Sequence, residues 1–142
     1  MYNKFMNGAR PLQGQTRYEV VEIYDNETGV LRIKQVLFDG KLHAPPNGDP
    51  SHAAYDEQGR PIVFIWHDQG RTHRESETEP SHISFYPNER IQRESFDVLG
   101  RPRDPRLGPY IQNRHMDTGE VLDSQSYQEL MELAADCSPL EP

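Results

Sequence analysis

Histidines and serines are the residues of this 142-residue chain best suited to catalysis or metal binding. Imidazole is both a general acid–base and a common metal ligand near neutral pH. Several of these residues recur at an interval of 30: His43 returns as His73, and Pro-Ser-His at 50–52 returns at 80–82. The full set is His43, His52, His67, His73, His82, His115, Ser51 and Ser81. A repeated position indicates a structural role, because an active site breaks the symmetry of a repeat.

A shared metal ion does not fit this spacing. Equivalent positions of successive β-hairpins lie two strands apart, about 9–10 Å, whereas zinc needs histidine nitrogens about 2.0–2.1 Å from the ion. The chain has no HExxH motif, and the single Cys137 allows neither a cysteine zinc site nor an internal disulfide. Phosphate-binding glycine motifs are also missing. We therefore predict no metal and no cofactor.

A nucleophile–base–acid triad can still be drawn from Ser51 or Ser81, a histidine and an aspartate. Both serines hold equivalent repeat positions, and serine is a common turn former, so the structural interpretation is favoured. We predict that the chain is not an enzyme and has no catalytic residues. The alternative left open is a hydrolase or metal-dependent enzyme that uses histidines and carboxylates on a sheet face.

Two glycine series set the spacing of the elements that carry these residues. The first series is Gly29, Gly59 and Gly119, with Glu89 in the open slot, and the second is Gly40, Gly70 and Gly100, each followed by a basic residue. Large apolar residues keep the same interval and should stack into continuous rows when the units pack side by side. The apolar sets are Val36, Trp66 and Phe96; Ile23, Ala53 and Ile83; and Tyr55 with Phe85.

Within a unit the pattern is strand, turn, strand, with Asp56–Gly59 closing a short hairpin. In the third copy the glycine is missing, and Asn88 is expected to take the left-handed conformation. A polar connector of about nine residues then leads to the next unit, and variable connectors on a fixed scaffold are where recognition surfaces usually lie.

These patterns predict an all-β fold, an antiparallel β-hairpin repeat meander of 30-residue units with about 7–8 strands and a short C-terminal α-helix. Residues 1–17 are an irregular lead-in, 18–123 the repeat domain, 124–137 a capping helix and 138–142 a loose tail. The prediction of this helix is based on a capping-box pattern at Ser126–Glu129. The sheet edges make a homodimer plausible.

The segment Phe38–His43, followed by Gly48-Asp49-Pro50 and Tyr55–Gly59, resembles the MORN-like variant β-hairpin repeats of bacteria, phages and large viruses. Trp66–Arg74 looks like a second copy of the same motif, and the resemblance covers residues 18–121. It implies a β-meander that serves as an interaction scaffold and brings no shared catalytic residues.

Charge and hydropathy restrict the partner. The net charge is −8, and residues 116–142 contain no basic and seven acidic side chains. This balance disfavours nucleic acid, which needs a basic face. No stretch approaches 18 apolar residues and the N-terminus does not resemble a signal peptide, so we expect no membrane span and a cytoplasmic location.

The expected partner is another protein. Arginine and aromatic side chains are enriched at the energetic centres of protein interfaces, and the proposed contact residues are Trp66, His73, Arg74, Tyr86, Arg93, Arg103 and Tyr110. The chain is predicted to be a non-enzymatic protein-binding module, an inhibitor or adaptor acting on a host or partner protein, of the kind that phages or mobile elements encode against host defence. The competing prediction is an immunity or antitoxin protein that neutralises a toxin.

Overall fold

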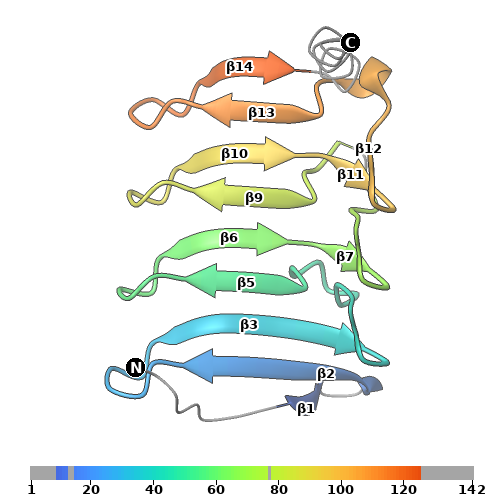
Figure 1. The fold of residues 1–142 in the computed structure, drawn as a ribbon, viewed down its shortest axis with the longest axis vertical. Helices are drawn as coiled ribbons and strands as arrows, with labels where there is room; N and C mark the ends of the chain where they lie inside the picture. Colours follow the sequence, from blue (N-terminus) through green and yellow to red (C-terminus); the bar gives the residue numbers. More distant parts are fainter. Residues whose placement is uncertain (1–8, 13–14, 77, 126–142) are drawn as a thin grey trace, which may run out of the picture.

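The computed structural model describes residues 9–12, 15–76 and 78–125. They form a single-layered antiparallel sheet in which successive hairpins lie side by side (Figure 1). The strands of this main sheet, in spatial order, are β1 (Ala9–Leu12), β2 (Gln15–Tyr24), β3 (Leu31–Phe38), β5 (His52–Tyr55), β6 (Pro61–Ile65), β9 (His82–Phe85), β10 (Ile91–Ser95), β13 (Ile111–Arg114) and β14 (Val121–Gln125). The predicted antiparallel hairpin arrangement is confirmed.

Each of the first three units also forms a second, smaller hairpin beside the main sheet. β4 (Lys41–Leu42) pairs with the end of β3, β7 (His67–Asp68) with β8 (Arg71–Thr72), and β11 (Asp97–Val98) with β12 (Arg101–Pro102). A short 3₁₀ turn, η1 (Pro105–Leu107), follows the last of them. These extra hairpins and β1 were not predicted, and together they explain why the strands outnumber the seven or eight expected.

The glycines of the second series lie at the tips of these small hairpins. Both tip residues have positive φ, 53° and 85° for Gln69 and Gly70, which is the two-residue type I′ turn. Asp39-Gly40 and Leu99-Gly100 take the same conformation. The repeated glycine is therefore required by backbone geometry at the second tip position.

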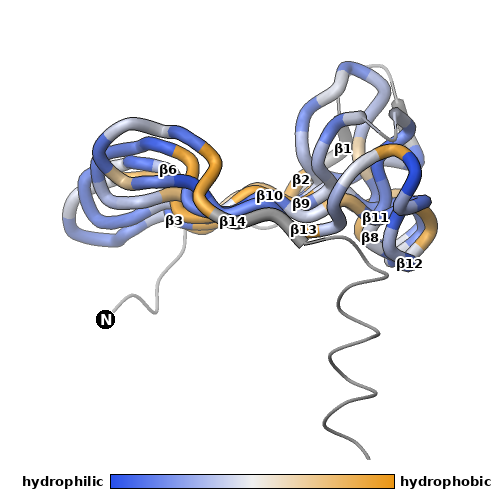
Figure 2. Tube along the Cα trace, turned by 90° about the horizontal axis from the view of Figure 1, so that it is seen from above, coloured by the Kyte–Doolittle hydropathy of each residue, from blue (hydrophilic) through white to orange (hydrophobic). Residues whose placement is uncertain are grey.

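The most continuous part of the core is a row of residues that alternate in size along the stack of units. Their exposed fractions are 2, 0, 7, 0 and 5% for Val36, Ser51, Trp66, Ser81 and Phe96. The row is held by backbone bonds such as Val36 N–H to Ser51 O and Trp66 N–H to Ser81 O, both 2.8 Å. The small serines leave room for the large side chains on either side. Figure 2, viewed along the stack, shows the units superimposed, with a flat centre between two curled ends.

The predicted equivalence of Ile23 with Ala53 and Ile83 is wrong. The turn of the first hairpin closes from Asp25 N–H to Val30 O, one residue longer than the turn from Asp56 N–H to Arg60 O. Because the extra residue precedes the glycine, Ile23 pairs with Ile33 and lies in the row of Ala54. Glu22 takes the place in the Ala53 row, since both residues pair with Lys34.

The third main turn also differs from its prediction. Glu89 (φ 72°) takes the left-handed conformation that Gly29, Gly59 and Gly119 take in the other turns, and Asn88 does not. The interval of 30 was therefore a better guide to the backbone than the residue type. Asn88 instead accepts from Arg90 N–H at 3.0 Å and donates to Met116 O at 3.1 Å.

The ends of the repeat domain lie further out than predicted. Residues 9–12 and 15–17, expected to be irregular, belong to β1 and β2. At the other end β14 continues to Gln125, so the first two residues of the predicted helix are in a strand. The remainder of that helix, 126–137, and the tail 138–142 lie outside the described residues. Within the described ranges, no helix has the length and apolar character needed to cross a membrane.

Candidate functional site

A hollow in the described part of the chain lies between the connectors of the first two units. Its volume is about 420 Å³, and β2, the two connectors and β7 form its walls. The lining residues are Tyr18, His43, Ala44, Pro45, Pro46, Gly48, Trp66, His67, Asp68, His73, Arg74 and Glu75. We call this the connector cavity. It brings together three of the seven predicted contact residues, Trp66, His73 and Arg74.

Trp66 and Arg74 form one side of the connector cavity and contact each other. The Arg74 guanidinium lies 3.9 Å from the centroid of the Trp66 ring, and its Nη1 donates to Pro80 O at 2.8 Å. The Trp66 indole N–H donates to Gly48 O at 3.0 Å. Burial lowers the pKa of Arg74, and Glu79, at 3.2 Å, partly opposes this shift. These contacts tie both connectors to one buried tryptophan.

His43 and His73 join successive units. His43 Nδ1 accepts from Gln69 N–H at 3.0 Å, and His73 Nδ1 accepts from Leu99 N–H at 2.9 Å. Each histidine therefore reaches the tip of the next small hairpin. The nitrogen left to carry the proton is Nε2, so each ring keeps one N–H donor.

His43 Nδ1 also lies 3.5 Å from Asp68 Oδ1. A charged pair at this contact would need a proton on Nδ1, which would leave Gln69 N–H without its acceptor. The shorter, directional bond uses Nδ1 as the acceptor for the backbone N–H, and the Asp68 carboxylate lies beside this nitrogen without a hydrogen bond to it.

Arg103 belongs to the scaffold and not to an exposed contact surface. The residue is only 5% exposed, and its guanidinium lies 3.7 Å from the centroid of the Phe96 ring. Nε and Nη2 both donate to Pro109 O, at 3.0 and 2.8 Å. This repeats the contact of Arg74 with Trp66 and Pro80, although Arg103 stands one residue earlier in its unit. The prediction that Arg103 contacts a partner does not agree with this burial.

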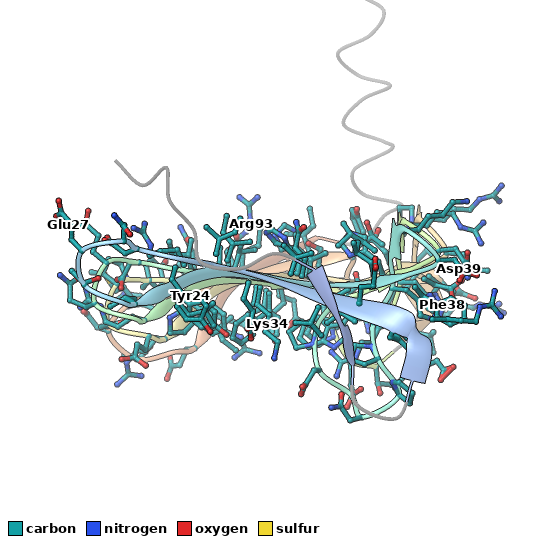
Figure 3. All side chains as sticks on the ribbon, turned by 90° about the horizontal axis from the view of Figure 1, so that it is seen from below. Tyr24, Glu27, Lys34, Phe38, Asp39 and Arg93 are labelled. Carbon is teal, nitrogen blue, oxygen red and sulfur yellow. The ribbon has the colours of Figure 1, made fainter. Side chains whose placement is uncertain are left out.

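The other predicted contact residues lie apart from the connector cavity. Tyr86 lines a shallow hollow of about 510 Å³ near the main turns and donates from its hydroxyl to Arg114 O at 2.8 Å. Tyr110 is half-buried, and burial together with Asp97 raises its pKa to about 12. Arg93 is exposed on the opposite side of the sheet from Lys34 and Tyr24 (Figure 3). The structure therefore does not gather the seven residues into one surface.

The remaining histidines of the main sheet form no metal site. His52 and His82 both pair with Ile65, one from each side, so a whole strand separates them. Gln35 donates to His52 Nδ1 at 3.0 Å. Burial lowers the pKa of His52, His67 and His82, which favours the neutral rings. Within the described ranges, no three metal-binding side chains are grouped for an ion.

The serines that suggested a nucleophile are buried in the core. Ser51 Oγ lies 2.7 Å from His67 Nδ1 and 3.1 Å from Ile65 O. Ser81 holds the same position, and its Oγ accepts from Asp97 N–H at 2.9 Å. Because both serines are fully buried, a substrate cannot reach either hydroxyl in this conformation.

Sequence reasoning missed several walls of the connector cavity, among them Tyr18, His43 and Pro45. The signal for His43 was present, because it is the repeat equivalent of His73. Tyr18 could not be found in this way, since it comes from the strand that precedes the first full unit.

No protein-family model, curated protein or solved structure matches the chain.

Proposed function

We propose that this chain is a non-enzymatic protein-binding module, an inhibitor or adaptor that holds a segment of a partner protein in the connector cavity. The observation that supports this function most is the way the cavity is built. Two connectors of different sequence form its walls, and both are fixed to Trp66 by hydrogen bonding or stacking. A preorganised recognition surface loses less free energy to ordering when it binds.

The chemistry of the walls fits a polypeptide partner. Tyr18, Pro45 and Trp66 supply apolar surface, and the Nε2–H groups of His43 and His73 supply donors for backbone carbonyl or carboxylate oxygens. Asp68 and Glu75 add acceptors at the same walls. Such mixed surfaces with a few aromatic anchors are typical of protein interfaces.

The test is co-purification of the tagged chain from its native host with a matched pair of substitutions. Glu75→Arg reverses a charge in the cavity wall, and Glu27→Arg makes the same change at a main turn at the other end of the hairpins, where Figure 3 labels Glu27. A stoichiometric partner should be lost from the first variant and retained by the second. If both variants retained the partner equally and had unchanged melting temperatures, the connector cavity would not be the binding site.

An immunity or antitoxin protein is the second candidate and would use the same surface. The identity of the captured partner separates the two functions, because a toxin supports the second, while a host protein supports an inhibitor or adaptor of phage or mobile-element origin. Genes neighbouring the coding sequence give an independent answer.

A further inference from the structure

The basic residues that follow the second glycine series form a column along the edge of the stack. Lys41, Arg71 and Arg101 each begin the second strand of a small hairpin, directly after its two-residue turn. All three are exposed. They are the same residue of three successive units, so they face the same direction from each hairpin. We call them the basic column.

Hydrogen bonds between hairpins fix the spacing of the basic column. Gly70 N–H donates to Leu42 O at 2.8 Å, and Gly100 N–H donates to Thr72 O at 2.7 Å. Each turn is thereby seated on the residue that follows the basic residue of the preceding unit. Successive units are two strands apart, so the cations repeat about every 9.4–9.8 Å.

The charges of the basic column are available to a ligand. Among the described residues, Lys41 and Arg101 have no ion-pair partner within 4.0 Å, and Arg71 has only a long 3.8 Å contact with Asp68. Arg71 extends along the stack, since a Cβ added at Gly100 would lie 3.6 Å from the Cβ of Arg71.

Few acidic side chains compete for these cations. The three small hairpins, 37–42, 67–72 and 97–102, contain three acidic residues, Asp39, Asp68 and Asp97. Asp39 is paired with Arg17. In the third hairpin the Asp97 carboxylate accepts from the Oγ of the buried Ser81 at 3.0 Å. The column is therefore a row of positive charge on a chain whose net charge is −8.

We propose that the basic column binds an acidic segment in the polyproline II conformation, with Asp or Glu at every third residue. A polyproline II helix has three residues per turn and rises about 3.1 Å per residue, so every third side chain lies on one face about 9.3 Å apart. This pitch matches the unit spacing of the column. An extended β-strand does not match, because its residues i and i+3 point to opposite faces.

This inference rests on the proposed function only in taking a polypeptide as the partner, and it uses residues outside the connector cavity. The probe is a fluorescent peptide of Glu-Pro-Pro repeats, compared with a peptide of the same composition in which the glutamates are grouped in pairs. Fluorescence polarisation at low ionic strength should show tighter binding of the regular peptide, with strong weakening as salt is added.

Single substitutions Lys41→Gln, Arg71→Gln and Arg101→Gln should each weaken binding of the regular peptide about two- to fivefold, as expected for exposed ion pairs. Arg93→Gln, an exposed position in β10 of the main sheet and outside the small hairpins, is the matched control and should change nothing. Equal binding of both peptides, no effect of Arg101→Gln, or preference for a single-stranded oligonucleotide would overturn the proposal. If Glu75→Arg lost the cellular partner but still bound the regular peptide, the result would support the basic column as a binding site separate from the connector cavity.

Discussion

Glu89 shows how the repeat overrides the preference of a single residue. A left-handed conformation costs a residue with a side chain about 1–2 kcal/mol, yet Glu89 adopts it with φ 72°. Gly29 has a similar φ of 76°, and a Cβ placed there would meet no atom within 4 Å. The two positions therefore differ in residue type while the backbone demand is the same.

Glu89→Gly should stabilise the protein by about 0.5–1 kcal/mol, because relief of the strain exceeds the extra entropy of glycine in the unfolded chain. The reverse change, Gly29→Glu, should destabilise it by about 1–2 kcal/mol. Urea unfolding of both variants beside the unmodified chain measures the difference. If Glu89→Gly lowered the midpoint, the side chain and not the backbone would dominate at this turn.

Arg103 is expected to act on stability and not directly on binding. Arg103→Ala removes a buried cation that stacks on Phe96 and donates twice to Pro109 O, and should cost about 2–4 kcal/mol. Arg93→Ala removes an arginine from an exposed position and should stay within about 0.5 kcal/mol of the unmodified chain. Thermal unfolding of the two variants tests this, and equal melting temperatures would contradict the assignment.

At the scale of elements, the small hairpins are coupled one to the next by histidine. The acceptor for the Leu99 amide is His73, and the acceptor for the Gln69 amide is His43. Both bonds join a connector to the tip of the following hairpin, so they transmit order along the stack. A unit in this fold depends on its neighbour, as expected of a repeat protein.

Replacing either histidine should therefore loosen one identified tip. In His73→Ala the Leu99 amide should exchange with solvent faster while the Gln69 amide is unchanged, and His43→Ala should give the opposite pattern. Each loss is worth about 0.5–1.5 kcal/mol. Hydrogen exchange followed by NMR resolves the two amides, and a uniform increase over both tips in either variant would show that the coupling is not local.

At the scale of the whole molecule, stability should fall in mildly acidic solution. Burial lowers the pKa of His52, His67 and His82 in the folded state below the ordinary value of about 6.5. The unfolded chain then binds more protons than the folded one as pH falls through 6.5. The three neutral rings therefore make their full contribution to the free energy of unfolding above pH 6.5, and this contribution is lost progressively as the pH falls below it.

Urea unfolding between pH 7.5 and 5 measures this loss, which precedes protonation of the aspartates whose pKa is lowered by hydrogen bonds, such as Asp25 and Asp56. His52→Gln should flatten the dependence in this interval, because the replacement cannot take up a proton. A variant with the same slope as the unmodified chain would exclude His52 from the effect.

The sequence alone determined the hairpin unit, its period and most of its core. A constant interval of 30 places Val36, Trp66 and Phe96 in one buried row. The same interval marks the positive φ of Glu89, although the prediction followed residue type and chose Asn88. These features follow from local patterns that recur in each unit, so the sequence contains the same evidence several times. Turn lengths were less accessible, because one extra residue before Gly29 shifts a whole strand without changing the glycine spacing.

Only the tertiary structure decided how the units use their connectors. The small I′ hairpins, the burial of Arg103 and the connector cavity all arise from contacts between neighbouring units, such as Gly100 N–H with Thr72 O. Interval and residue type cannot tell a buried arginine from an exposed one, since Arg103 and Arg93 look alike in the chain. Whether a side chain in a repeat is buried depends on how the next unit packs against it, and only the tertiary structure shows that packing.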